Sequence, residues 1–258
     1  MKTKPAELPQ AETVDFAELA KMYKSGEINL ICVLGPTASG KTKYAVRLAK
    51  ALNGEIISAD SRQIYRGMDI GTGKDLTDYN GVPYHLIDIL PAGAQYNAHN
   101  FQQDFHKAYE DIRSRGKVPV LCGGTGLYIS AVTGGYNWDG EKRALSEAKD
   151  SPILKTYFIG TLVDRDERNR HIDARLDARI AEGLCEEVKG LIEQGVSAEK
   201  LISYGLEYKY VTEHILGQRS LEDMREKLAI AIHQFAKRQM TWFRGMERSG
   251  VRIHWVQV

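Results

Sequence analysis

The sequence predicts an α/β protein in which a parallel β-sheet is flanked by helices and is followed by a mostly helical C-terminal part. Two observations lead to this prediction. From residue 28 to residue 162, short apolar runs alternate with segments of helical periodicity, which is typical of a parallel sheet covered on both faces. After residue 163, apolar residues recur at helical spacing almost to the end of the chain.

The expected strands are short apolar runs bounded by turn-forming or charged residues. They lie at 28–34, 55–58, 85–89, 118–122 and 156–162, with a last short strand at 251–256. Apolar runs of this length that do not alternate with polar residues are typical of strands buried on both faces of a parallel sheet.

The expected helices are segments in which apolar residues recur every three or four positions. They lie at 13–25, 43–52, 98–115, 164–182, 184–194, 207–215 and about 220–245. Asn97 is expected to cap the helix at 98–115, and Gly116 to end it. Ser220, with Asp223 three residues later, predicts a start close to a capping box for the last helix.

We divide the chain into two parts. Residues 1–27 are expected to form a loose tail and a short docking helix, and residues 28–258 the core. Within the core, 134–153 is the least regular stretch and 164–248 is largely helical. No internal repeat or low-complexity tract interrupts this organisation.

Composition indicates an ordinary globular protein without a global charge. Of 258 residues, 43% are hydrophobic and 27% charged, and the formal net charge is +1. Any contact with nucleic acid therefore has to come from a local basic patch. Three cysteines without a C-x-x-C pair argue against a zinc site. With no apolar run of signal-peptide or membrane-span length, we expect a cytoplasmic protein without membrane contacts, and a monomer by default.

The residues that follow the first strand carry the G-x-x-x-x-G-K-[ST] pattern of a phosphate-binding loop. They are Gly35, Pro36, Thr37, Ala38, Ser39, Gly40, Lys41 and Thr42. Glycines let backbone N–H groups converge on phosphate oxygens, and the following helix points its positive end at them. Lys41 adds a mobile positive charge, and the Thr42 hydroxyl is placed to bind Mg²⁺. The expected fold is therefore that of a P-loop NTPase-like protein.

A second informative segment, 57–74, begins at the carboxyl end of an expected strand. Ligands bind at that edge in open α/β sheets, so Asp60 is expected to point its carboxylate at whatever the loop holds. An alternative interpretation makes Asp60 the N-cap of a short helix over 61–66. The two interpretations are compatible.

The phosphate loop alone also fits an ATP-dependent kinase or NTPase. Asp88, after the apolar pair 86–87, offers only a weak match to a Walker-B aspartate. A small-molecule kinase would also need an arginine-rich lid. The stretch 163–179 supplies arginines for one at Arg165, Arg168, Arg170, Arg175 and Arg179. The phosphate loop by itself therefore leaves an ATP-dependent kinase or NTPase open as an alternative.

Five ordered motifs carry a resemblance to a known family. They are 35–42, 58–74, 83–88, 123–128 and 237–244. Together they resemble the tRNA dimethylallyltransferases, also called tRNA isopentenyltransferases, over nearly the whole chain from residue 28 on. The resemblance implies that the loop binds dimethylallyl diphosphate and not ATP. It also implies an acceptor, the exocyclic N6 amine of the adenine just 3′ of the anticodon in tRNA.

The resemblance assigns chemical roles in this reaction to the base and to the groups that stabilise the leaving diphosphate. Asp60 corresponds to the carboxylate that takes a proton from the amine as the C–N bond forms. Lys41, Thr42 and Mg²⁺ stabilise the charge that develops on the leaving diphosphate. Arg175 matches the last arginine of a family helix and is expected to clamp the diphosphate. His171 stands where the family usually has arginine.

The resemblance also assigns acceptor residues. Ser61, Arg62 and Gln63 match positions beside the flipped-out adenine, and Thr125 matches a position next to the acceptor nucleotide. A basic helix with an interleaved tryptophan is expected to contact the tRNA. Its matching residues are Lys237, Arg238, Gln239, Trp242 and Arg244.

Two departures from the family pattern concern the acceptor. The family carries a helical insertion that grips the anticodon stem, and here only 134–153 stands in its place, with 142–145 resembling its end. Glu207 stands where the family has arginine, and its charge would repel an RNA phosphate. The related adenylate isopentenyltransferases lack a large insertion, so free AMP, ADP or ATP remains the alternative acceptor. A more distant alternative is a different reaction, that of an ATP-dependent phosphotransferase.

Overall fold

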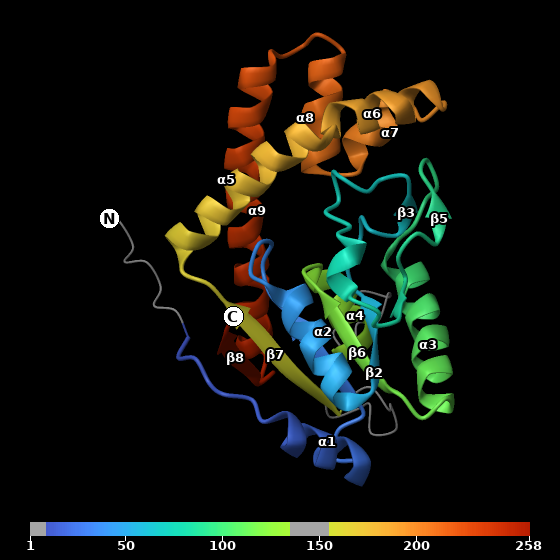
Figure 1. Ribbon diagram of the computed structural model, residues 1–258, viewed down its shortest axis with the longest axis vertical. Coiled ribbons are helices and arrows are strands. Elements are labelled where there is room, and N and C mark those ends of the chain that lie inside the picture. Colours follow the sequence, from blue (N-terminus) through green and yellow to red (C-terminus); the bar gives the residue numbers. More distant parts are fainter. Residues whose placement is uncertain (1–8, 135–154) are drawn as a thin grey trace.

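The computed structural model describes residues 9–134 and 155–258, and these residues form a parallel six-stranded sheet with helices on both faces (Figure 1). The strand order is β4-β2-β6-β1-β7-β8, and every registered neighbour runs parallel. The strands are β1 (Leu30–Leu34), β2 (Gly54–Ser58), β4 (Tyr84–His85), β6 (Val118–Gly123), β7 (Thr156–Leu162) and β8 (Ile253–Gln257). The predicted fold class is confirmed.

The central strand β1 shows why apolar runs form this sheet. All five of its residues are buried, and they alternate between two cores. Ile31 and Val33 face the core made with α1 (Phe16–Ser25), α2 (Lys41–Leu52) and the 3₁₀ helix η1 (Leu76–Tyr79). The other residues of β1 face α3 (Ala98–Ser114), α4 (Gly126–Thr133) and the end of α9 (Leu221–Arg248). Burial on both faces requires the unbroken apolar run that the sequence shows.

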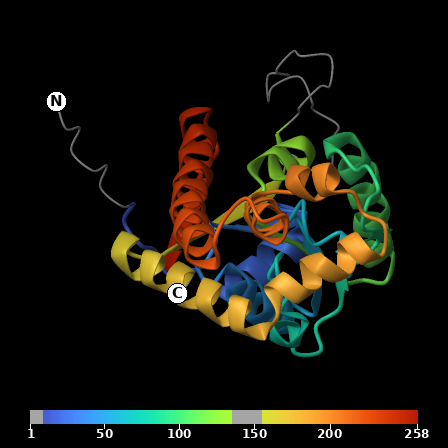
Figure 2. The same cartoon turned by 90° about the horizontal axis from the view of Figure 1, so that it is seen from above.

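Helices α5 to α8 and the first part of α9 form a separate layer above the carboxyl edge of the sheet, and α9 then continues down beside the sheet (Figure 1). The remaining members are α5 (Arg165–Glu182), α6 (Leu184–Glu193), α7 (Ala198–Ser203) and α8 (Leu206–Ile215). They share a third apolar core with the loops that follow β2. Seen from above, α5 runs past α9 and continues into α6 (Figure 2), and α5 contacts α9. This layer covers the edge where ligands bind in parallel sheets.

Helix caps predicted from the sequence are confirmed. Asn97 precedes α3 and its side chain accepts a hydrogen bond from the Asn100 backbone N–H, in a reciprocal capping box. Ser220 precedes α9 and accepts from the Asp223 N–H. Short polar side chains at these positions satisfy N–H groups that the first helical turn leaves without partners.

The strand predicted at 85–89 is wrong. Only the pair Tyr84–His85 joins the sheet, beside β2. Leu86 and Asp88 then adopt left-handed φ angles of 62° and 56°, which no strand accommodates. The chain turns there and pairs β5 (Leu90–Pro91) with β3 (Tyr65–Arg66) in a separate two-stranded ribbon.

Two further elements differ from the predictions. No helix forms over 61–66, because the chain turns there and enters β3. The Asp60 Oδ1 atom instead accepts a hydrogen bond from the Arg62 N–H at 2.9 Å, which stabilises the turn. The short helix α7 was not predicted. The irregular stretch 134–153 lies almost entirely outside the described residues, so its expected relation to a family insertion stays a prediction.

The buried Glu55 on β2 gives a prediction about stability. Its carboxylate accepts from Arg115 (Nη2 at 2.8 Å) and lies 2.7 Å from His85 Nε2. These partners, Arg115 first, hold the pKa of Glu55 at about 2, below its ordinary 4.5. Because the folded-state pKa is depressed, the stabilisation is present above about pH 4.5 and is lost as pH falls towards 2.

We therefore expect Glu55→Gln to lower the free energy of unfolding by about 1–2 kcal/mol at pH 7, since Arg115 is partly exposed and solvent screens the pair. Urea unfolding of both proteins between pH 7 and 2.5 measures this. The difference should shrink below pH 4.5. A difference that is constant with pH would contradict the assignment.

Candidate active site

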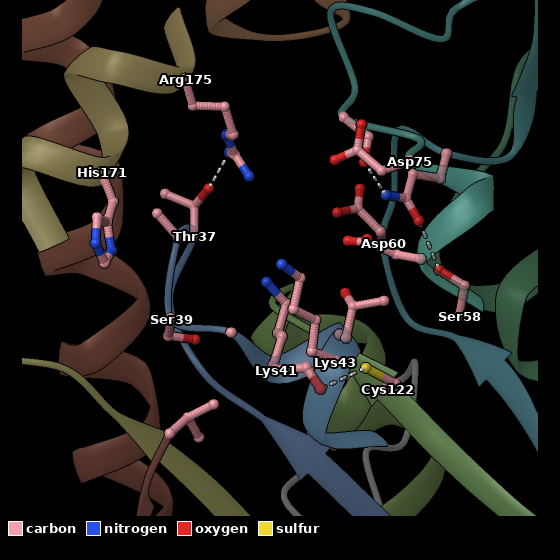
Figure 3. Close-up of a pocket in the computed structure, with 18 of the residues that line it drawn as sticks. Thr37, Ser39, Lys41, Lys43, Ser58, Asp60, Asp75, Cys122, His171 and Arg175 are labelled. Atoms are coloured by element: carbon pink, nitrogen blue, oxygen red, sulfur yellow. Dashed lines mark hydrogen bonds between the residues drawn. The ribbon is translucent and has the colours of Figure 1, made fainter. Parts of the chain in front are cut away.

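The carboxyl ends of four strands place residues 37–42 of the phosphate loop, Asp60 and Arg175 around one cavity of about 390 Å³, which Gly35 and Pro36 do not line. The phosphate loop follows β1, Asp60 follows β2, Gly123 ends β6, and α5 follows β7. Figure 3 shows Lys41, Asp60 and Arg175 surrounding one space. Parallel strands bring these segments to the same edge, although they are far apart in the sequence.

The phosphate loop is held in shape by its own contacts and by neighbouring strands. Ala38 and Gly40 adopt left-handed φ angles of 59° and 75°, and Gly40 directly precedes α2. The Ser39 hydroxyl donates to the Pro36 carbonyl at 2.8 Å and lies 2.6 Å from the Thr161 hydroxyl of β7. The loop therefore curves around the N-terminus of α2, where backbone N–H groups and the helix dipole favour an anion.

Two cations face this loop in a desolvated environment. An Arg175 N–H from α5 donates to the Thr37 hydroxyl at 2.6 Å (Figure 3). Burial, together with the nearby charge of Arg179, lowers the pKa of Arg175 to about 10. Burial likewise lowers the pKa of Lys41, although Cys122 and Asp60 oppose that shift. Two desolvated positive groups beside a phosphate loop provide a site for an anionic ligand such as a diphosphate.

A second cavity of about 330 Å³ adjoins the first. Five residues line both cavities: Thr37, Lys41, Asp60, Thr72 and Arg175. Apart from these, much of the second cavity is lined by apolar and aromatic side chains, namely Leu127, Tyr204, Leu206, Tyr208, Ile232, Phe235 and Trp242. Asp60 thus lies at the boundary between a polar cavity and a more apolar one.

Most predicted acceptor residues lie around the second cavity. Those that line it are Ser61, Arg62, Thr125, Arg238, Gln239 and Trp242. The Thr125 hydroxyl accepts from the Ser61 N–H at 3.2 Å, which joins the loops after β2 and β6. Gln63 lines the first cavity instead. Lys237 and Arg244 lie on α9 but line neither cavity.

Gln239 uses both ends of its side-chain amide inside the protein. Its Oε1 accepts from the Thr37 N–H at 2.8 Å, and its Nε2 donates to the Gly124 carbonyl at 2.9 Å. The residue is 8% exposed. The family resemblance implied an RNA contact here, which stays a prediction, and the geometry shows that Gln239 also bridges the phosphate loop and the loop after β6.

Trp242 has a mixed environment. Its side chain is 39% exposed, yet its Nε1–H donates to the Ser130 hydroxyl at 3.1 Å. A Cβ atom at Gly126 would lie 2.3 Å from the indole ring, so only glycine fits beneath it. The tryptophan is therefore fixed in orientation while part of its side chain stays exposed.

Glu207 also lines the second cavity. Burial raises the pKa of its carboxyl group, and the positive charges of Arg179 and Arg175 act in the opposite direction. The side chain thus lies within the electrostatic reach of these two arginines, in the wall of the cavity. The sequence did not indicate this neighbourhood, because Glu207 and the two arginines lie on different helices, α8 and α5, and only the tertiary structure brings them to one cavity.

Sequence reasoning missed several lining residues of the first cavity. They include Thr72, Gly73, Asp75, Asp78, Tyr79 and Cys122. The first three lie in or next to the 57–74 segment, whose glycine pattern was a usable signal. Cys122 required the structure, because its sequence context indicated only a buried strand. Burial raises the pKa of its thiol to about 12.

The residues present fit a Mg²⁺ ion held mainly by substrate. Thr42 lines the first cavity next to Lys41. Within 9–134 and 155–258, no group of three or more His, Cys, Asp or Glu residues could hold a metal ion. Mg²⁺ characteristically takes one or two protein groups together with phosphate oxygens, so a hydroxyl beside a phosphate loop is sufficient.

The site combines a phosphate loop and its desolvated cations with an adjoining apolar cavity, and one carboxylate lies between the two. This combination defines a P-loop enzyme of the group-transfer class. Comparison with known sequences is consistent with this class. The family model described as IPP transferase matches residues 63–151 and 138–246, and that described as isopentenyl transferase matches 28–79. The chain belongs to the tRNA dimethylallyltransferase family.

The relatives are similar over most of their length. A protein named tRNA dimethylallyltransferase 1 from Azobacteroides pseudotrichonymphae is 47% identical, over 90% of this chain and 94% of its own. One named tRNA dimethylallyltransferase 2 from Porphyromonas gingivalis is 49% identical, over 88% and 93%. The crystal structure of a tRNA Δ(2)-isopentenylpyrophosphate transferase from Staphylococcus epidermidis superposes with a TM-score of 0.75 at 33% identity, covering 88% of this chain and 92% of that one.

The alignments also show that the relatives contain residues this chain lacks. The two alignments extend over 287 and 281 positions, more than the 258 residues of the chain, so some positions of the relatives have no counterpart here. The match to the IPP transferase model is divided into two segments that overlap at 138–151. This is the region where the sequence predicts a shortened insertion.

No helix in the described parts of the chain is long and apolar enough to cross a membrane.

Proposed function

We propose that this protein transfers a dimethylallyl group from dimethylallyl diphosphate to the N6 amine of an adenine in the anticodon loop of tRNA. The observation that carries the proposal is the position of Asp60, whose carboxylate lies where the polar and the apolar cavities meet. Family membership supports the reaction class. We expect the enzyme to act in the cytoplasm as a monomer.

At the donor end, the allylic C–O bond breaks and its electron pair leaves with the diphosphate. Charge therefore grows on the leaving group as the reaction proceeds. Lys41, Arg175 and the loop N–H groups stabilise that charge where it develops. When bound, Mg²⁺ would add charge neutralisation at the phosphate oxygens, and Thr42 would hold it.

At the acceptor end, the adenine N6 attacks the allylic carbon and a C–N bond forms. The N6 lone pair is delocalised into the ring, so the amine becomes acidic only as this bond grows. The Asp60 carboxylate then accepts the proton. The hydrogen bond from the Arg62 N–H orients Oδ1 of that carboxylate. The aromatic wall around Trp242 suits a base that has left the anticodon stack.

A free adenine nucleotide is the second candidate acceptor. The alignments with the named tRNA enzymes contain gaps in this chain, which favours a smaller acceptor-binding surface. The donor chemistry is the same in both cases. An ATP-dependent phosphotransferase would use the same loop but would transfer phosphate and not carbon.

A single incubation series tests the proposal. Labelled dimethylallyl diphosphate and Mg²⁺ are offered with bulk tRNA, an anticodon stem-loop, or AMP. We expect label in tRNA and in the stem-loop, and none in a control stem-loop with guanosine in place of the adenosine 3′ of the anticodon. Label in AMP alone would overturn the tRNA acceptor. Phosphate transfer from ATP without prenylation would overturn the reaction class.

A further inference from the structure

One loop forms the wall between the two cavities. Thr72 lines both cavities, Gly71 lines the second, and Gly73 lines the first. The loop runs from the end of β3 to η1, and none of its residues is among the site residues predicted from the sequence. Its position nevertheless sets how the donor and acceptor cavities meet.

A carboxylate from α6 holds this loop. Glu187 Oε2 accepts from the N–H groups of Asp69 and Ile70, both at 2.7 Å. Its Oε1 accepts from the Gly71 N–H at 3.1 Å and from the Tyr208 hydroxyl at 2.8 Å. Three successive backbone amides on one carboxylate form charge-assisted bonds, which are stronger than neutral ones.

Packing presses the same loop against the helical layer. A Cβ atom at Gly71 would lie 2.8 Å from the Tyr208 ring, and one at Gly73 would lie 2.1 Å from Arg179 Nη2. Only glycines allow this approach. The far end is anchored by Lys74, whose Nζ donates to the Tyr65 carbonyl at 2.8 Å.

A hydrogen bond connects this loop to Gln63, one of the predicted acceptor residues. The Gly73 carbonyl accepts from Gln63 Nε2 at 3.2 Å. The Ser58 hydroxyl donates to Gln63 Oε1, also at 3.2 Å, at the end of the strand that carries Asp60. A displaced loop would therefore move Gln63 and change the space around the Asp60 carboxylate.

We propose that Glu187 is a positioning residue for the transfer reaction. From α6 it fixes the loop that separates donor from acceptor, and so fixes the approach of the acceptor amine to the allylic carbon. The inference rests on the proposed function. Glu187 lines neither cavity, so its effect has to act through geometry and not through contact with substrate.

Glu187→Gln tests the inference with little change in volume. The new NH₂ group would face an N–H or O–H donor, so the loop loses at least one of its bonds. We expect kcat to fall about 10- to 100-fold, because a displacement of about 1 Å costs this much in an oriented reaction. The dissociation constant for dimethylallyl diphosphate, measured without acceptor, should change less than about threefold, because the phosphate loop is untouched. The matched control is Glu186→Gln, the exposed neighbour on α6, which should behave as wild type.

Gly71→Ala displaces the same loop by a different route. The added methyl group crowds Tyr208 and leaves the Glu187 carboxylate intact. We expect the same signature, with lower kcat and nearly unchanged donor affinity. Gly190→Ala on α6 is the matched control, since its nearest neighbouring atom would be 4.0 Å away.

Thermal unfolding of every variant separates positioning from folding. An unchanged kcat in folded Glu187→Gln would overturn the inference. So would a loss of kcat that is fully explained by the fraction of unfolded protein at the assay temperature, or a collapse of donor affinity. If wild type prenylates tRNA while Glu187→Gln matches it, only this inference fails. If wild type prenylates no acceptor, the proposed function fails and the inference falls with it.

Discussion

Replacing Asp60 with asparagine is expected to lower kcat by about 10²- to 10⁴-fold while donor affinity stays nearly unchanged. The amide has almost the same shape as the carboxylate but cannot accept the proton of the N6 amine. Asp60 lies at the boundary of the two cavities and not within the phosphate loop, so diphosphate binding should remain. Single-turnover prenylation of a stem-loop, with donor affinity from calorimetry, measures both quantities.

The Asp60 experiment has a matched control variant and one outcome that would contradict it. Asp166→Asn makes the same chemical change at an exposed position of α5 and should retain full activity. A collapse of donor binding in Asp60→Asn would mean that Asp60 holds the metal or the loop. That result would contradict its assignment as the base.

Replacing Arg175 with methionine is expected to lower kcat/KM for the donor by about 10²- to 10³-fold, comparable with the loss of one donor from an oxyanion hole. Arg175 donates to the Thr37 hydroxyl and lines both cavities, so its charge lies where the leaving group develops negative charge. Thr37→Val removes only the hydroxyl that orients this guanidinium. It should cost less than the arginine replacement. Equal losses in the two variants would contradict a direct role for the charge.

The same cations predict an alkaline decline in activity. Burial lowers the pKa of Arg175 to about 10 and also lowers that of Lys41. A lowered pKa means that a cation loses its charge at a lower pH than usual. The wild-type kcat/KM for the donor should therefore fall as pH rises towards 10, whereas a profile that stays flat to pH 11 would argue against these groups as diphosphate ligands.

Local patterns predicted the strands and helices whose signals are self-contained. The buried run before the phosphate loop became β1, and Asn97 and Ser220 cap the helices they were expected to cap. These signals depend on a few neighbouring residues and on burial, so the folded structure contains the elements that they predict. The run at 85–89 had a strand composition too, but left-handed Leu86 and Asp88 turn the chain there, and the residues after it, β5, pair with β3. That outcome depends on a partner far along the chain.

In the candidate site, too, some features could be predicted from local sequence patterns and others could not. The G-x-x-x-x-G-K-[ST] pattern and the strand before Asp60 were enough to expect a phosphate site with a carboxylate beside it. Gln239 shows what local patterns leave out, because its match to a tRNA-contacting helix of the family implied an RNA contact and said nothing of its partners inside the protein. Its partner Thr37 lies 202 residues away and donates to Oε1, while the other end of the amide donates to the Gly124 carbonyl. Which partners a polar side chain finds is decided by packing and not by its neighbours in sequence.

By itself, the sequence determined the parallel sheet, the phosphate loop and the residue types available at the edge of that sheet, because glycines, short polar caps and apolar runs act through the local backbone. Only the tertiary structure decided how those residues are used. It placed Asp60 between two cavities, and brought Arg175 to Thr37. It also set Glu187 against three backbone amides of a remote loop. Hydrogen-bond partners and desolvation are properties of the packed helical layer, and no local pattern encodes them.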